Sequence, residues 1–189
     1  GLSLPFHKRG HNIDFAIDID KYSIETFKHN HKSKTSNILN ENIKNLFKIK
    51  SDLVYDDKFD LVMGGPPCQG FSGIGIRRSY SVDKEQLPSN HLYQDMSYFI
   101  HKTQPKIFLF ENVEGLLSSK WNKEGVRGEI FKDVLKTFQN LKGYDVKYKL
   151  VHAKDYGVPQ NRPRVLIVGI KSTIVKNHTD DMDAVSGGF

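Results

Sequence analysis

The chain has 189 residues and a formal net charge of +6, from 28 lysines and arginines against 22 aspartates and glutamates. This length fits one domain with a single hydrophobic core better than two separate domains. No apolar run approaches the roughly 18 residues that a membrane-spanning helix needs, and no signal peptide is recognisable, so we expect an intracellular protein without a membrane partner. The basic charge suits a polyanionic partner such as a nucleic acid but does not require one.

Apolar runs that favour β-strands alternate with stretches of helical periodicity. This alternation predicts an α/β fold in which a parallel sheet is covered by helices on both faces. The expected strands cover residues 13–18, 59–63, 107–110, 146–150 and 165–170. The expected helices are one capped by Asp20, one at residues 92–102 that ends before Pro105, and one at residues 129–141 that ends before Gly143. Residues 70–90 and 115–128 lack periodicity, and such long loops are often functional.

Cys68 is the only cysteine in the chain, which excludes an internal disulfide bond and a cysteine-based zinc cluster, and we expect no metal site. It ends the segment Gly-Gly-Pro-Pro-Cys at residues 64–68, directly after the second expected strand. Ligands bind at the carboxyl ends of strands in open parallel sheets, and prolines beside glycines stiffen the chain while allowing close approach. This setting favours a nucleophilic thiol over the alternative of a small buried hydrophobic residue.

Glu111 follows the third expected strand, so its carboxylate is expected beside Cys68 at the same edge of the sheet. A partly buried glutamate can act as an acid toward a bound heterocycle, although a carboxylate at this place can also be a helix cap. Arg162 and Arg164 precede the last expected strand. Residues two apart in an extended chain point to the same side, so both could address one anionic or carbonyl oxygen; the alternative is a solvated basic face.

Four segments taken in order resemble the motifs of the DNA (cytosine-5) methyltransferases. They are Asp-Ile-Asp at 18–20, Gly-Pro-Pro-Cys-Gln-Gly-Phe-Ser at 65–72, Glu-Asn-Val at 111–113 and Gln-Asn-Arg-Pro-Arg at 160–164. The resemblance covers nearly the whole chain. It implies a Rossmann-like, S-adenosylmethionine-dependent methyltransferase sheet with helices on both faces, which acts on a cytosine flipped out of double-stranded DNA in a restriction-modification context.

The resemblance implies chemical roles for four side chains. Cys68 would add to carbon 6 of cytosine and turn the ring into an enamine that attacks the methyl sulfonium. Glu111 would protonate or hydrogen-bond ring nitrogen 3, and Arg164 with Arg162 would hold the carbonyl oxygen as charge develops. A base, water in this family, would remove the proton from carbon 5 before Cys68 leaves.

The resemblance also assigns binding residues. Asp18 would bind the ribose hydroxyls of S-adenosylmethionine, and Ile19 would pack on its adenine. Asn37 and Ile38 would replace an Asp-Ile pair beside the adenine amino group, where the Asn oxygen can still accept a hydrogen bond. The other expected cofactor contacts are Leu92, Pro67 and Gly1, and the expected nucleic-acid contacts are Gln69, Ser72, Arg77 and Arg78, in a loop that closes on DNA.

The chain departs from the family pattern at both ends. Residues 1–171 match the catalytic domain, whereas residues 172–189 form a polar, Gly-rich tail without a recognisable target recognition domain, which a second polypeptide could carry. Residues 183–189 followed by residues 1–4 resemble the family's missing first motif, so the tail could complete the cofactor loop with Gly187 and Gly188. The alternative is chance, because Gly-rich termini are common.

Three other functions stay open from the sequence. The chain could methylate cytosine in tRNA, since a branch of the family uses the same motifs, or it could be an incomplete, non-catalytic nucleic-acid-binding remnant. The intact Cys68, Glu111 and Arg164 argue against a remnant. A thiol-redox role is disfavoured, because there is no second cysteine to resolve an oxidised thiol.

Overall fold

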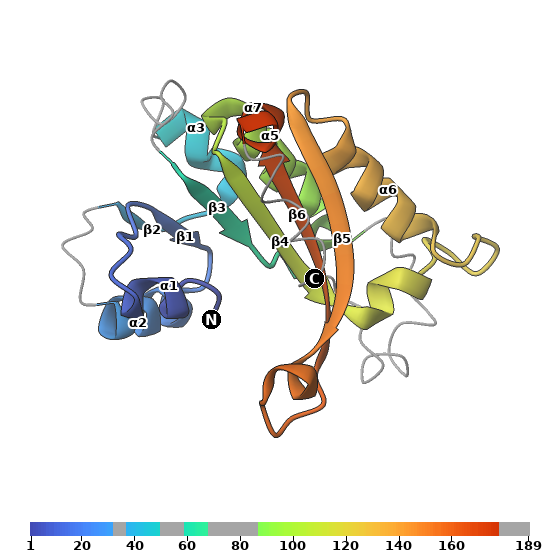
Figure 1. The fold of residues 1–189 in the computed structure, drawn as a ribbon, viewed down its shortest axis with the longest axis horizontal. Helices are drawn as coiled ribbons and strands as arrows, with labels where there is room; N and C mark the ends of the chain where they lie inside the picture. The colour runs from blue at the N-terminus through green and yellow to red at the C-terminus, as the bar shows by residue number, and fades with distance from the viewer. Residues whose placement is uncertain (32–36, 50–58, 68–86, 178–189) are drawn as a thin grey trace.

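The computed structural model describes residues 1–31, 37–49, 59–67 and 87–177 (Figure 1). Its strands are β1 Ala16–Asp18, β2 Ile38–Asn40, β3 Leu61–Gly64, β4 Ile107–Val113, β5 Tyr144–His152 and β6 Pro163–Lys171. Its α-helices are α1 Leu4–Lys8, α2 Lys21–Asn30, α3 Leu46–Ile49, α5 Leu92–Thr103, α6 Glu129–Gln139 and α7 Ser172–Asn177. Short 3-10 helices are η1 Ile43–Asn45, η4 Pro88–His91, η5 Glu114–Ser118 and η6 Ala153–Tyr156. Among the described residues, no helix is both long and apolar enough to cross a membrane.

The strands form two hydrogen-bonded groups. Strands β1 and β2 pair in parallel, and so do β3 and β4, but β6 runs antiparallel to both β4 and β5. Strands β3, β4 and β5 thus share one direction, and among the described strands the expectation of a fully parallel sheet is wrong for β6. Residues 153–162 join β5 to β6 as a hairpin, and a parallel pair would need a crossover connection of a dozen or more residues.

The main core lies on one face of the four-stranded sheet, beneath α5 and α6, which Figure 1 shows behind the strands. Phe108, Phe110, Val165 and Ile167 supply the fully buried side chains of the strands. Gly169 leaves room for the Phe108 ring, since a Cβ there would lie 2.0 Å from a ring carbon. Alternate residues of β4 and β6 thus point into the core, and the residues between them face the other way.

A second apolar cluster joins the two groups of strands into one layer. Leu46 and Phe99 are its buried members, and side chains of β1, β2 and β3 pack against them. Figure 1 shows the strands across the layer in the order β2, β1, β3, β4, β6, β5. Helix α2 also contacts β1 and β2. Its buried residue, Ile24, is not a member of the Leu46–Phe99 cluster, so α2 packs on these strands outside that cluster. Helices thus lie on both faces of a Rossmann-like α/β layer, as expected.

Local signals explain the ends of several elements. The Asp20 side chain accepts a hydrogen bond from the Tyr22 amide and caps α2 as expected. Helix α5 ends at Gln104, which has a left-handed conformation (φ 46°) and precedes Pro105. Strand β4 runs three residues longer than expected, through Val113. The expected polar tail begins with the helix α7, and residues 178–189 lie outside the described part.

Candidate active site

The chain that leaves β3 is fixed against the end of β4. A Cβ on Gly65 would lie 2.9 Å from Oε2 of Glu111, so a side chain at this position would require the carboxylate to move. Next to it, Nδ2 of the buried Asn112 donates a hydrogen bond to the carbonyl oxygen of Pro66 at 3.1 Å. These two contacts hold the Gly-Pro-Pro segment, and the structure thus places Glu111 at the same sheet edge as the end of β3, as expected.

Glu111 also forms an ion pair with Arg164. In the part of the chain that the structure describes, this is the one ion pair between two of the expected catalytic residues. Oε1 of Glu111 lies 2.7 Å from Nε of Arg164 on the antiparallel strand β6. The two side chains are 26% and 19% exposed, so the pair is largely shielded from water while still reachable by a ligand. A carboxylate and a guanidinium side by side present both an acceptor and a donor to a polar heterocycle.

Arg162 does not join this pair. It lies one residue before β6 begins, its side chain is exposed, and it makes no ion pair with the residues that the structure describes. The expectation that both arginines address one oxygen is therefore not met in this structure. The extended geometry that would align them begins only at Pro163.

The expected nucleophile follows this cluster directly in the sequence, because Cys68 comes after Pro67. Cys68 and the expected nucleic-acid contacts lie outside the described residues; these contacts are Gln69, Ser72, Arg77 and Arg78. The exposed Pro67 is the last described residue before them. Their roles stay predictions from the sequence.

Asp18 ends β1 with an exposed side chain, as expected for a ligand contact. Its Oδ1 accepts a hydrogen bond from the Asp20 amide at 2.9 Å, which leaves Oδ2 for a ligand. The side chain of Asn40 donates to the backbone carbonyls of Asp18 and Ile19, at 3.1 and 2.8 Å, and so fixes the turn. Ile19 follows Asp18 directly and is 71% exposed, so its side chain is accessible to a ligand at this turn.

Asn37 and Ile38 lie at the other end of β2. Ile38 is opposite Ala16, at the start of β1, whereas Asn40 is opposite Asp18. The sequence predicts Asn37 beside the Asp18 site. Three residues of a strand span about 10 Å, so the register instead places Asn37 about that far from the site, at the other end of β2. A second Asn-Ile pair, Asn42 and Ile43, follows β2 at the correct end.

Two other features of this end of β2 were missed from the sequence. The Glu41 amide donates to the Asp18 carbonyl at 3.1 Å. Hydrogen bonds from the Asn42 amide and the Asn45 side chain lower the pKa of Glu41 below its usual value. A second ionised carboxylate therefore lies near Asp18, and only the position of Glu41 just after a strand could have indicated it.

The structure separates the remaining expected cofactor contacts. Leu92 is half-buried at the start of α5, whereas Gly1 is exposed with nothing within 4 Å of its Cβ position. Ser3 bonds to His31, which caps the C-terminal end of α2, and so lies at the far end of that helix from Asp18. The contacts of the described residues thus do not bring Gly1 to Asp18.

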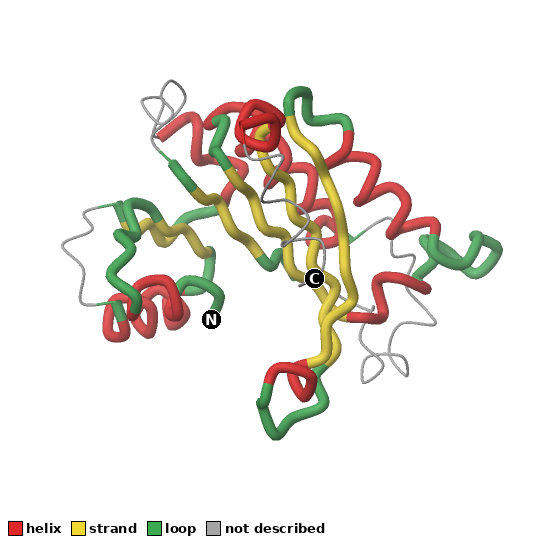
Figure 2. Tube along the Cα trace, viewed as in Figure 1, coloured by secondary structure: helices red, strands yellow, loops and turns green. Residues whose placement is uncertain are grey.

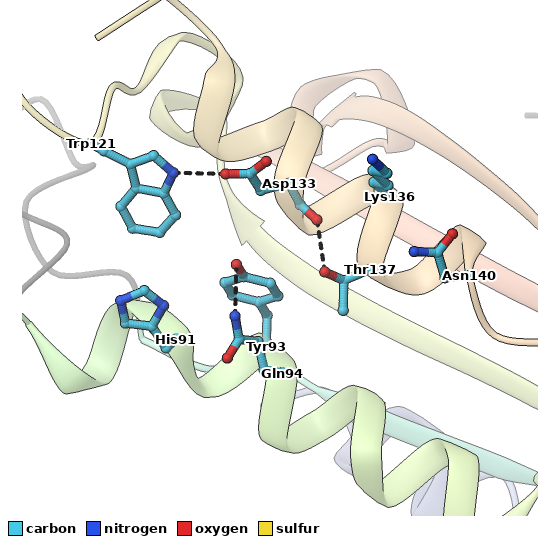
Figure 3. Close-up of a pocket in the computed structure, with 8 residues that line it drawn as sticks. All are labelled: His91, Tyr93, Gln94, Trp121, Asp133, Lys136, Thr137 and Asn140. Atoms are coloured by element: carbon cyan, nitrogen blue, oxygen red, sulfur yellow. Dashed lines mark hydrogen bonds between the residues drawn. The ribbon is translucent and has the colours of Figure 1, made fainter. Parts of the chain in front are cut away.

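A cavity of about 340 Å³ lies between α5 and α6, and none of its lining residues is an expected site residue (Figure 3). Trp121 closes one end, where its Nε1 donates to Asp133 Oδ2 at 2.7 Å and its ring stacks on His91. Glu129 accepts hydrogen bonds from the amides of Trp121 and Val126. The loop at residues 115–128 is therefore anchored to α6 by its own contacts, which gives it a structural role.

Comparisons with known proteins agree with the motifs. The family profile described as C-5 cytosine-specific DNA methylase matches residues 1–185. The chain is 37% identical to the Type II methyltransferase M.FnuDI of Fusobacterium nucleatum, over 92% of this chain and 45% of that protein. It is 36% identical to the Type II methyltransferase M.NgoPII of Neisseria gonorrhoeae, over 92% of this chain and 46% of that protein. The chain thus spans about half the length of these curated relatives.

Solved structures support the fold. A prophage protein from E. coli described as a DNA modification methyltransferase superposes with a TM-score of 0.68 and 29% identity, over 92% of this chain and 44% of that chain. The Dnmt2 methyltransferase of S. pombe superposes with a TM-score of 0.57 and 20% identity, over 89% of this chain and 45% of that chain.

Proposed function

Because the chain belongs to the C-5 cytosine-specific DNA methylase family, we propose that it transfers a methyl group from S-adenosylmethionine to carbon 5 of a cytosine in DNA. The observation that carries the proposal is the Glu111–Arg164 pair, held against the Gly-Pro-Pro segment that leads to Cys68. Segments that lie far apart in the sequence thus meet directly before Cys68 in the chain.

Cys68 is the nucleophile of the proposed reaction. Its thiolate would add to carbon 6 of the flipped base. The ring electrons that this frees would let carbon 5 bond to the methyl group while the bond from that methyl to the sulfonium sulfur breaks, which leaves S-adenosylhomocysteine. The proton on carbon 5 then passes to water, the bond from Cys68 to carbon 6 breaks, and the aromatic ring is restored. The hydrogen bond from Asn112 to the Pro66 carbonyl supports this role, because it fixes the chain two residues before the thiol.

Glu111 and Arg164 hold the base during these steps. The carboxyl group of Glu111 interacts with ring nitrogen 3, where electrons accumulate after the addition, and the guanidinium of Arg164 donates to the carbonyl oxygen. Their 2.7 Å contact orients each group before the base arrives, which lowers the reorganisation that the reaction requires.

The cofactor site fits the donor set around Asp18. Oδ2 of Asp18, which has no hydrogen-bond partner among the described residues, suits a ribose diol, and the exposed Ile19 suits the flat face of an adenine. Asn42 replaces Asn37 in the proposal as the amide beside the adenine amino group, with Leu92 and Pro67 toward the methionine end. S-adenosylmethionine, when bound there, supplies the activated methyl group.

The nucleic-acid substrate is double-stranded DNA in this proposal, because the family profile that matches residues 1–185 is that of DNA methylases. A second polypeptide, or a further part of the same protein, would carry the target recognition domain. Methylation of tRNA is the alternative. A filter assay with labelled S-adenosylmethionine distinguishes them: methyl transfer to duplex DNA supports the proposal, and transfer to tRNA alone contradicts it.

The role of Cys68 has its own test, in which any missing recognition part is supplied. We expect Cys68→Ser to abolish methyl transfer while the circular dichroism spectrum stays unchanged, since the two side chains have nearly the same size. A duplex containing 5-fluorocytosine should trap the wild-type chain covalently, because fluorine cannot leave as a proton. Methyl transfer by the serine variant, or a trapped adduct at another residue, would contradict this role.

A further inference from the structure

Strand β5 and the hairpin after it carry four cations outside the proposed active site. These residues, named here the basic strip, are Lys147, Lys149, Lys154 and Arg162. Lys149 is half-buried and the other three are exposed. No carboxylate in the part of the chain that the structure describes forms an ion pair with any of them. Their charge is therefore available to an external anion.

The strand register places Lys147 and Lys149 of the basic strip on the same face of the sheet as the Glu111–Arg164 pair. Lys149 is opposite Leu166 of β6, and Leu166 is opposite Glu111 of β4. Residues directly opposite each other share a face, and neighbouring strands are about 4.8 Å apart, so the Lys149 and Glu111 backbones are about 10 Å apart. Lys147 lies on the same face, two residues along β5 from Lys149 and further from the Glu111–Arg164 pair.

The hairpin extends the basic strip past the edge where the proposed chemistry occurs. Strand β4 ends at Val113, opposite Arg164, whereas β5 and β6 continue to the pair His152 and Pro163 and then to the tip. Figures 1 and 2 show this hairpin projecting from the sheet beyond the end of β4. All residues from 154 to 162 are exposed, including Tyr156 at 60%. A projecting arm of this kind has its whole surface available to a large ligand.

We propose that the basic strip binds phosphates of the DNA strand that carries the target cytosine. The inference rests on the proposed function, and it adds a contact surface on the β5–β6 side of the site to the loop contacts expected at residues 69–78. Two acidic residues, Asp145 and Asp155, lie among the four cations, so the strip has a net positive charge. Two of these cations lie on the face of the Glu111–Arg164 pair and two lie on the projecting hairpin, and none of them has an ion-pair partner among the described residues. Cations placed in this way, close to a site that receives a flipped nucleotide, match the regular negative charge of a nucleic-acid backbone.

The test compares two triple variants of the full chain with the same change in charge. The strip variant carries Lys147→Gln, Lys149→Gln and Lys154→Gln. The control variant carries Lys132→Gln, Lys136→Gln and Lys142→Gln, which are exposed lysines on and just after α6, on the other side of the sheet. Binding to a fluorescent DNA duplex is measured by anisotropy across a salt series, and circular dichroism confirms that both variants fold.

We expect the strip variant to bind duplex DNA about tenfold to a hundredfold more weakly at low salt, with a salt slope reduced by about 0.9 for each lost phosphate contact. The control variant should bind like the wild type. Equal binding by the two variants would overturn the inference, as would strip-dependent binding to polyglutamate without strip-dependent binding to DNA, which would indicate an acidic protein partner.

Separate measurements distinguish a failure of the basic-strip inference from a failure of the proposed function. Calorimetry of S-adenosylmethionine binding reports on the site near Asp18 and does not depend on the three lysines, and methyl transfer by the wild-type chain reports on the proposed chemistry at Cys68. Methyl transfer with equal DNA binding by both variants would reject the basic strip and retain the proposed function. Strip-dependent DNA binding without cofactor binding would retain the strip and reject the proposed function.

Discussion

The approach of the Gly65 backbone to the Glu111 carboxylate depends on the absence of a side chain. We expect Gly65→Ala to reduce methyl transfer at least tenfold, because the new Cβ would lie 2.9 Å from Oε2 and push the carboxylate away from Arg164. The matched control is Gly64→Ala, whose Cβ would meet only the flexible end of Met96. Methyl-transfer kinetics and the midpoint of urea unfolding are measured for both. Equal effects of the two substitutions would contradict a special role of Gly65.

Asp18 provides a test of the cofactor site at the same scale. We expect Asp18→Ala to weaken S-adenosylmethionine binding by about 1 to 3 kcal/mol, the usual cost of losing hydrogen bonds to a charged group. Calorimetry measures the change directly. Asn37→Ala is the control, since Asn37 lies at the opposite end of β2 and should leave the affinity unchanged. An unchanged affinity for Asp18→Ala would show that the ribose binds elsewhere.

Single residues of the site could be predicted from the sequence where a motif and a strand end coincide. Asp18 ends β1 as the sequence predicts, whereas Glu111 lies two residues before the end of β4, because the strand continues past the apolar run through its pairing with β6. Asn112, Asn40 and Glu41 were missed, since their roles come from hydrogen bonds to backbone groups more than 20 residues away that no local pattern encodes.

At the scale of elements, helices with a regular apolar face were predictable and short strands were not. Helix α6 buries Ile130, Val134 and Phe138 on one side, which the spacing in the sequence already indicated. Strand β2 has only three residues, too few to show alternation. The antiparallel direction of β6 depends on its pairing with β4, and such long-range pairing cannot be read from periodicity.

Leu46 provides a test of how the elements are coupled. Its fully buried side chain packs, with Phe99, against residues of β1, β2 and β3. We expect Leu46→Ala to lower the free energy of unfolding by about 2 to 5 kcal/mol. Fluorescence of Trp121, which lies beside α6, and circular dichroism should shift together because the cluster couples both groups of strands. The control Val126→Ala, at a residue 66% exposed, should change stability by less than about 0.5 kcal/mol.

At the scale of the whole molecule, the described residues separate the tasks of the proposed enzyme. In the proposal, the end of β1 and the residues after β2 would hold the cofactor, the ends of β3 and β4 with the start of β6 would carry out the chemistry, and the β5–β6 hairpin would contact the DNA backbone. The contacts of Ser3 keep Gly1 away from Asp18, so the proposal assigns the methionine end of the cofactor to Leu92 and Pro67.

The tail provides the last test, because residues 178–189 lie outside the described part and their role is a prediction from the sequence alone. If the tail completes the cofactor loop, the double variant Gly187→Val and Gly188→Val should weaken S-adenosylmethionine binding at least tenfold, since side chains would block the close approach of the backbone to the cofactor. The unfolding midpoint and binding of DNA to the basic strip should stay unchanged. The control variant, Asp180→Asn with Asp181→Asn, alters the charge of the tail and keeps its glycines. Wild-type cofactor affinity in the valine variant would exclude the tail from the cofactor site. The resemblance of the tail to the first motif would then be a chance match.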